Sequence, residues 1–279
     1  MSTVTITAAD INKLRQMTGA GMMDCRKALT ENNGDFDAAI DWLRKKGQKV
    51  AALRGDRDAK EGVVLAKTTA DNKSGIALCL SCETDFVSKN ADFIAFAQSI
   101  MDTAIANNVK SVDELNAASI NGAKIADLVN DKLASIGEKI GISKFERVDA
   151  DYVASYIHGA NRMGVLVGLN KSEAEVGKDV AMQIAAMNPV AIDATLVPAE
   201  VVEREKGVII ELIKNDPKMA GKPDEMISKI ADGKLNAFFK ESTLLAQTFV
   251  KDAGLSVGDY MKCKGADLKV LAFKRVALG

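Results

Sequence analysis

The sequence predicts an α+β protein, because the spacing of its apolar residues changes from a helical period to a strand period and back again. Residues 1–54 show helical spacing only. Two later segments, starting at residues 62 and 152, each contain two short apolar runs around a polar turn, followed by a helical stretch. Residues 201–240 return to helical spacing around a segment with Pro and Gly. These patterns predict a three-helix N-terminal domain, two pseudo-repeated ββα core subdomains and an inserted antiparallel helical hairpin.

The composition is that of a globular protein with about two to three domains. The 279 residues are 47% hydrophobic and 27% charged, with 37 basic and 38 acidic side chains and a formal net charge of -1. A nucleic-acid-binding protein usually has a basic surplus, so we expect no nucleic-acid partner. No apolar run approaches the roughly 18 residues that span a bilayer, and residues 1–6 lack the features of a secretory signal. We therefore expect a cytoplasmic protein with no membrane partner and four reduced cysteines.

The N-terminal domain, residues 1–54, is predicted to contain three short helices. Thr7 and Asp10 have the spacing of a capping box at the start of the first helix, and Gly19 and Gly21 break that helix. The second helix is predicted to carry four apolar residues on one side, namely Met22, Cys25, Ala28 and Leu29.

The third helix is predicted to start at the capping residue Asp35 and to stop at Gly47. Trp42 is expected to serve packing within this domain and contact with the linker. Residues 48–61 are charged and lack an apolar stripe, which indicates a linker with some helical character. Of these, residues 55–61 are expected to separate the N-terminal domain from the core.

The two ββα units are predicted to form a pseudo-symmetric core. In the first, strands at 62–67 and 75–80 precede a helix that begins near residue 90; in the second, strands at 152–157 and 164–169 precede another helix. An alternating apolar pattern at 268–276 indicates a last strand that returns to the second unit. We therefore expect one subdomain at residues 62–145 and another at 146–200 and 241–279.

A helical hairpin at residues 201–240 is predicted to interrupt the second subdomain. Val208, Ile209 and Leu212 keep helical spacing before a break at residues 216–223, and Met226, Ile227 and Ile230 keep it afterwards. Each helix therefore has an apolar stripe that it can bury against the other.

Two short motifs are the most informative candidates for function. In the segment Thr84-Asp85-Phe86-Val87, an exposed phenylalanine would forgo roughly 1.5–3 kcal/mol of burial, so the residues alone favour a ring packed beneath its own loop. In the second motif, Met22 and Met23 follow a glycine-rich turn. Adjacent residues cannot share one helix face, so at least one of these methionines is expected at the surface or the rim. Exposed methionine is an adaptable contact for another protein.

The remaining candidates carry weaker arguments. His158 is the only histidine, so it cannot build a metal site without other ligands, and a turn histidine bonded to its own backbone is the simple alternative. Cys79 and Cys82 lie three apart in a predicted strand and should point to opposite faces, which disfavours zinc. The sequence contains no P-loop, nucleophile elbow or dinucleotide fingerprint. We therefore expect no enzyme, no catalytic residue, no metal and no cofactor.

The glycine–methionine turn and the Thr84-Asp85-Phe86 segment, in this order near the N-terminus, resemble the bacterial translation elongation factor Ts family. The resemblance extends from about residue 8 to the end of the chain. It implies a ubiquitin-associated-like three-helix domain and a guanine-nucleotide exchange factor that releases GDP from elongation factor Tu. It also implies that Phe86 enters the partner between helices near its Mg²⁺ and phosphate site.

The resemblance implies a set of partner-binding residues, which are Arg15, Met22, Met23, Arg26, Thr84, Asp85, Phe86, Val87, Ile136, Gly137 and His158. Arg26 departs from the lysine that is common in the family, although it keeps the charge. A further helical module of some family members is expected to be absent, since the chain stops at Gly279. The hairpin at 201–240 resembles the family's dimerisation element, which leaves a homodimer open.

Two other classes of function stay open from the residues themselves. One is an adaptor whose three-helix domain binds a ubiquitin-like or peptide partner; binding that depends on Met22 and not on Phe86 would favour it. The other is a thiol enzyme that uses Cys82, which a buried and unreactive Cys82 would exclude.

Overall fold

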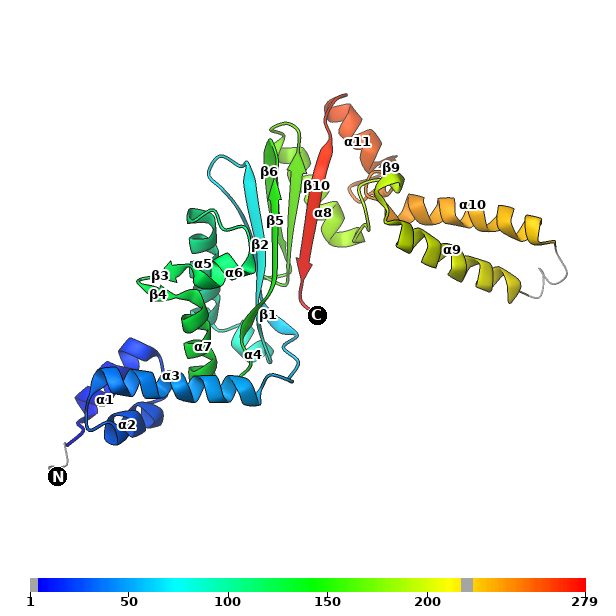
Figure 1. The fold of residues 1–279 in the computed structure, drawn as a ribbon. Coiled ribbons are helices and arrows are strands. Elements are labelled where there is room, and N and C mark those ends of the chain that lie inside the picture. The colour runs from blue at the N-terminus through cyan, green and yellow to red at the C-terminus, as the bar shows by residue number, and fades with distance from the viewer. Residues whose placement is uncertain (1–4, 217–222) are drawn as a thin grey trace.

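The computed structural model describes residues 5–216 and 223–279, and it confirms the predicted α+β class. Figure 1 shows an elongated molecule in which a bundle of α1 (Ala8–Thr18), α2 (Met22–Glu31) and α3 (Phe36–Leu53) lies at one end. The helical hairpin projects from the opposite side, and the strands lie between the two.

The start of the N-terminal bundle follows its local sequence signals. The backbone N–H of Asp10 donates to the Thr7 hydroxyl at 3.2 Å, and the Asp10 carboxylate accepts from the Thr7 N–H at 3.0 Å, which is the predicted capping box. Gly19 ends α1 at a φ of 68°, in the left-handed region that favours glycine. The Asp35 carboxylate accepts from the N–H of Ala38 at 3.0 Å at the start of α3, as predicted. The apolar interior contains Leu14, Cys25, Ala28, Leu29, Ala39 and Leu43.

The prediction that Gly47 ends the third helix is wrong. The helix α3 continues through this glycine to Leu53, so the helical character expected for residues 48–61 is present as far as Leu53. Gly47 is buried against α7 (Ile125–Ile136), where an added Cβ would lie only 2.8 Å from the Cβ of Ala134. The glycine therefore permits a close approach of two helices, and this packing outweighs its helix propensity, which is about 1 kcal/mol poorer than that of alanine.

The core contains two three-stranded antiparallel sheets, in the orders β1-β2-β5 and β10-β7-β6. The first contains β1 (Glu61–Thr68) and β2 (Ser74–Cys82), and the second contains β6 (Tyr152–His158) and β7 (Met163–Leu169). The predicted helices follow as α5 (Ala91–Ala106) and α8 (Ala174–Met187), and both ββα units are present. The predicted last strand is β10 (Val270–Ala277), which pairs with β7.

The strand β5 (Gly141–Asp149) was not predicted, and the expected domain boundary at 145/146 falls inside it. Its apolar residues Ile142, Phe145 and Val148 recur every third position, and polar residues lie between them. The pairing of β5 with β2 has a register irregularity at Cys79 and Leu80. Such an irregularity breaks the alternation by which a strand is found in a sequence.

The two sheets pack face to face, with helices on both outer sides. Val64, Ala77 and Cys79 of one sheet meet Val153 and Leu166 of the other. An added Cβ on Gly75 would lie 2.8 Å from the Cγ1 of Val153 and 2.9 Å from the Cδ2 of Leu166, so a larger residue here would force these side chains to shift, and the glycine favours the close approach of the sheets. Helices α5 and α7 cover the outer face of the first sheet, and α8 and α11 (Val257–Lys264) cover that of the second. The strands therefore lie inside a four-layer core.

Short elements complete the chain. They are α4 (Asp85–Ser88), α6 (Val112–Ala117), β3 (Ser119–Ile120), β4 (Ala123–Lys124), the 3₁₀ turn η1 (Ala194–Leu196), β8 (Thr248–Phe249) and β9 (Asp252–Ser256).

The predicted hairpin is formed by α9 (Ala199–Lys214) and α10 (Asp224–Ser242), which lie side by side (Figure 1). Ile209, Ile213, Ile227 and Ala231 make up its buried interior. Most of the predicted break, residues 217–222, lies outside the described residues. No helix in the described part of the chain has the length and apolar character needed to cross a membrane.

Candidate functional site

Phe86 is the most exposed large apolar residue described, with 86% of its surface accessible. It lies on α4, a single helical turn just after β2. Its neighbour Val87 is half-buried and packs against the first core cluster. The packed alternative for Phe86 is therefore wrong: the turn buries the valine and presents the ring to solvent.

The turn α4 is held at its start by a residue from a distant part of the chain. The Glu138 carboxylate accepts hydrogen bonds from the backbone N–H of Thr84 at 3.1 Å and from the Thr84 hydroxyl at 2.8 Å. The Cys82 thiol donates to the Thr84 carbonyl at 3.2 Å. Asp85 pairs on the surface with Lys89 at 2.6 Å, and that hydrogen bond lowers the pKa of Asp85. The backbone N–H, the carbonyl and the hydroxyl of Thr84 therefore all make hydrogen bonds.

Glu83, the residue before Thr84, makes the complementary link. Its largely buried carboxylate accepts from the backbone N–H of Lys139 at 2.6 Å and from the Arg54 guanidinium at 2.8 and 3.0 Å. Arg57 adds a contact at 3.3 Å. The backbone hydrogen bond from Lys139, followed by the hydrogen bond from Arg54, lowers the pKa of Glu83. The carboxylate is therefore charged, and both of its oxygens accept hydrogen bonds.

Sequence reasoning missed both glutamates. Glu83 lies within the conspicuous Cys82-Glu83-Thr84-Asp85-Phe86 segment, so its position was the available clue. Glu138 directly follows the pair Ile136-Gly137 but is 54 residues from Thr84 in the sequence, and no local pattern connects the two.

A groove of about 350 Å³ lies beside the exposed ring and is called here the Phe86 groove. It collects three predicted site residues, because Phe86, Val87 and Ile136 all line it, together with Gly19 of the turn between α1 and α2. Ile136 is 38% exposed. The next residue, Gly137, ends α7 with a φ of 79°. A second groove of about 400 Å³ shares Gly19, Lys132 and Ser135 with the first and extends to Met17 and Phe96. The N-terminal bundle and the core therefore form one continuous concave surface.

The two methionines of the glycine-rich turn are both exposed, Met22 by 52% and Met23 by 73%. The expectation that at least one of them lies at the surface is therefore confirmed, and Met22 is not buried with Cys25, Ala28 and Leu29. Met22 is the first residue of the helix, beyond the end of the bundle's interior. Arg15 and Arg26 are exposed as well. None of these four residues lines the Phe86 groove, although the same bundle contributes Gly19 to it.

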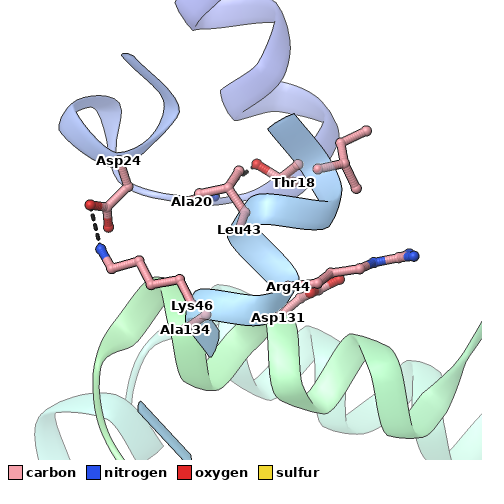
Figure 2. Close-up of a pocket in the computed structure, with 9 residues that line it drawn as sticks. Thr18, Ala20, Asp24, Leu43, Arg44, Lys46, Asp131 and Ala134 are labelled. Atoms are coloured by element: carbon pink, nitrogen blue, oxygen red, sulfur yellow. Dashed lines mark hydrogen bonds and ion pairs between the residues drawn. The ribbon is translucent and has the colours of Figure 1, made fainter. Parts of the chain in front are cut away.

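The bundle is fixed against α7 at the junction drawn in Figure 2. A small cavity of about 20 Å³ lies between the α1–α2 turn, α3 and α7. Lys46 of α3 pairs with Asp24 of α2 at 2.5 Å, and Arg44 lies beside Asp131 of α7 (Figure 2). Burial raises the pKa of Asp131, and the charge of Arg44 opposes that shift. Residues on α1–α3 therefore keep a defined position relative to α7.

His158 lies apart from the Phe86 groove, at the end of β6. It is exposed, and its Nδ1 lies 3.0 Å from the Tyr156 hydroxyl, so its partner is a side chain and not its own backbone. Arg162, in the turn after His158, contacts Glu61 at 3.3 Å, and Glu61 pairs with Cys82 in the sheet. His158 thus belongs to the hairpin that packs near the strand ends preceding α4.

The cysteines show no arrangement for thiol chemistry. Cys79 faces the second sheet and Cys82 faces α5, as predicted for residues three apart in a strand. Burial raises the pKa of Cys82 to about 12, so at neutral pH the thiol is protonated and unreactive. This contradicts the thiol-enzyme alternative. Within residues 5–216 and 223–279, no three His, Cys, Asp or Glu side chains group in a way that could hold a metal ion.

An exposed aromatic ring, exposed methionines and an adjoining groove are features of surfaces that contact other folded proteins. The fold and this surface are therefore those of a protein that binds another folded protein. The sequence model of the family described as "Elongation factor TS" matches residues 83–279. The chain belongs to the elongation factor Ts family.

Curated relatives support this assignment over the whole chain. The Elongation factor Ts of Christiangramia forsetii is 49% identical over 277 residues, covering 98% of this chain and 99% of the relative. Those of Flavobacterium psychrophilum and Amoebophilus asiaticus are each 47% identical over 278 residues, with at least 98% of this chain and 99% of each relative covered. The resemblance seen in the motifs is thus confirmed, including the part of the chain before residue 83.

Proposed function

We propose that this protein is a guanine-nucleotide exchange factor that binds elongation factor Tu in its GDP-bound form and promotes GDP release during translation elongation. The observation that carries the proposal is Phe86, an aromatic ring that is 86% exposed on a turn whose backbone is held by Glu138. A ring in this position contributes nothing to its own core and is available to enter a partner.

The physical basis is thermodynamic linkage. A protein that binds nucleotide-free elongation factor Tu more tightly than the GDP-bound form must weaken GDP binding by the same factor. Phe86 is the proposed differential contact: its insertion near the Mg²⁺ and phosphate site of the partner favours the nucleotide-free state. The protein needs no cofactor or catalytic residue of its own for this role.

The other proposed contacts supply binding energy in both nucleotide states. Arg15, Met22, Met23 and Arg26 present charge and adaptable apolar surface from the N-terminal bundle. Ile136, at the end of α7 before Gly137, extends the apolar surface beside Phe86 and Val87. His158 is proposed as a separate contact away from the nucleotide domain. Thr84 and Asp85 shape the turn that carries the ring.

The cellular setting and assembly remain predictions. We expect the protein to act in the cytoplasm, with no nucleic-acid or membrane partner. A homodimer through the hairpin would use Val208, Leu212 and Met226, which are exposed although the hairpin buries its isoleucines internally. Sedimentation at increasing protein concentration measures this, and a constant monomer mass would contradict it.

The deciding experiment measures release of a fluorescent GDP from elongation factor Tu with the intact chain and with Phe86→Ala. Faster release with the intact chain, and loss of most of that acceleration in the variant, are the expected results. Equal loss of docking and exchange would remove the insertion mechanism. No acceleration by the folded, intact chain would leave the adaptor alternative, for which binding depends on Met22 and is indifferent to Phe86.

A further inference from the structure

Two pairs of adjacent residues, Glu83-Thr84 and Glu138-Lys139, are joined by reciprocal hydrogen bonds. The carboxylate of Glu138 accepts from the N–H of Thr84 at 3.1 Å, and the carboxylate of Glu83 accepts from the N–H of Lys139 at 2.6 Å. We call this arrangement the Glu83–Glu138 clamp. Resting on the proposed exchange function, we infer that Glu138 is a positioning residue for Phe86 and that the clamp sets the ring in its active orientation before the partner binds.

The turn that carries Phe86 is held internally by short-range hydrogen bonds, such as that from the Lys89 N–H to the Asp85 carbonyl at 3.1 Å, and these do not fix how the turn lies on the core. It contains four residues, far fewer than the roughly 12–15 that an isolated helix needs in water. The Phe86 ring is exposed, and Val87 is the half-buried contact that connects α4 with the core. The orientation of the ring therefore depends on how the backbone enters the turn, which is the place that Glu138 holds.

Glu138 is suited to this role by its location as well as its chemistry. It follows Gly137, whose left-handed conformation ends α7 and redirects the chain toward Thr84. One carboxylate oxygen accepts a hydrogen bond from the Thr84 N–H, and the other accepts one from the Thr84 hydroxyl at 2.8 Å. Both oxygens of Glu138 therefore bind the same residue. Hydrogen bonds to a charged acceptor are stronger than neutral ones, which makes this a firm constraint on the turn.

The clamp also connects the turn to the N-terminal bundle. Arg54, just after α3, donates to Glu83, and the Lys139 ammonium donates to the carbonyls of Gly55 at 2.6 Å and Arg57 at 2.9 Å. The position of the ring relative to the bundle that carries Met22 and Met23 is therefore set in the free protein. Prior ordering of separate contacts reduces the entropy lost on binding, which is the general advantage of a preorganised surface.

Three variants test the inference. Glu138→Ala removes both hydrogen bonds to Thr84, whereas Glu138→Gln keeps an oxygen for the N–H and an amide that can pair with the hydroxyl. Glu146→Ala is the matched control: Glu146 of β5 forms an ion pair with Lys274 of β10 at 2.8 Å and lies opposite Ala77, away from the end of β2 that leads into α4. Each is measured as the intact chain, with thermal unfolding to verify the fold.

Two readouts separate positioning from general stability. The first is GDP release from elongation factor Tu, measured for each variant with Phe86 present and with Phe86→Ala. The second is deuterium uptake by the backbone of residues 83–90 in the free protein. We expect Glu138→Ala to slow assisted GDP release roughly tenfold, as the loss of hydrogen bonds to a charged group predicts, and to have little further effect once Phe86 is alanine. Uptake at residues 83–90 should rise, Glu138→Gln should restore most of the rate, and the control should match the intact chain.

Two results would contradict a positioning role for Glu138. Unchanged uptake in Glu138→Ala, or an equal loss of rate with and without Phe86, would overturn the inference, since the residue would then act elsewhere than through the ring. If Glu138→Ala does not fold, Thr84→Val removes the hydroxyl contact alone and must raise uptake and slow release for the inference to stand. Failure of the proposed function is recognised separately, because the intact chain itself would not accelerate GDP release.

Discussion

Gly47 of α3 faces Ala134 of α7 so closely that a Cβ on the glycine would lie 2.8 Å from the alanine Cβ and 3.3 Å from the Asn130 carbonyl oxygen. The neighbours are helix backbone and a short side chain, so neither can move aside easily. This contact, together with the Glu83–Glu138 clamp, joins the N-terminal bundle to the core.

Replacing this glycine should destabilise the junction. We expect Gly47→Ala to lower the free energy of unfolding by about 1–3 kcal/mol, because overpacking costs more than the better helix propensity of alanine returns. Gly207→Ala is the matched control, since an added Cβ on Gly207 of α9 meets nothing within 4 Å and should stabilise by about 0.5–1 kcal/mol. Urea unfolding measures both. Shifts of the same sign would contradict the packing explanation.

Phe86→Ala should affect function and leave stability nearly unchanged. The ring is exposed, so the free energy of unfolding should stay within about 0.5 kcal/mol of the intact chain, while assisted GDP release falls sharply. Phe93→Ala is the contrast: that ring is 1% exposed in the first core cluster and its loss should cost about 3–5 kcal/mol. Calorimetry and nucleotide release test the pair together. A large drop in stability for Phe86→Ala would show that the ring packs in solution.

The thiols should differ in accessibility. Cys25, Cys79 and Cys82 are buried and Cys263 is exposed, so one thiol should react rapidly with an aromatic disulfide reagent at pH 8, and Cys263→Ser should abolish that phase. Rapid reaction of a second thiol in the native protein would contradict the burial of the other three cysteines.

The raised pKa of Cys82 predicts how the free energy of unfolding changes at alkaline pH. Burial raises it from the ordinary value of 9.0 to about 12, so the folded protein retains a proton that the unfolded chain releases. The stabilisation from the neutral thiol is complete below pH 9 and is lost as the pH rises toward 12. The unfolding free energy of Cys82→Ala should therefore fall less steeply over this interval than that of the intact chain. Parallel pH profiles would contradict the assignment to Cys82.

Asp179 should contribute to stability at neutral pH and lose that contribution in acid. Burial opposes ionisation of this side chain, but hydrogen bonds from Lys251 at 2.6 Å and Tyr260 at 2.7 Å outweigh it and lower the pKa of the carboxyl below 3.8. A carboxyl with a lowered pKa stabilises the fold above the unfolded value, and protonation removes this as the pH falls further.

The corresponding test compares Asp179→Ala with Asp151→Ala, an exposed carboxylate just before β6. The first should cost about 1.5–3 kcal/mol at pH 7, because Tyr260 loses its buried partner, and the second should cost little. Chemical unfolding at pH 7 and below pH 3.8 measures the difference between them. A cost for Asp179→Ala that does not shrink in acid would contradict the role of its charge.

Elements with local signals could be predicted from the sequence. The Thr7–Asp10 capping box, the helix start at Asn90 and the turn between β1 and β2 each depend on residues a few positions apart, and each is present as expected. The hairpin and the last strand also followed from the spacing of apolar residues. Site residues were found where a short motif made them conspicuous, as in the segment around Phe86.

The sequence by itself determined the fold class, the repeated ββα units and the motifs that mark the family, because these are written in local periodicity and short spacings. Only the tertiary structure decided that Gly47 continues a helix, that residues 141–149 form an edge strand, and that Glu138 holds the turn of Phe86. Each of these depends on a neighbour far away in the chain. Packing and hydrogen bonding between distant segments outweigh local propensity wherever the two disagree.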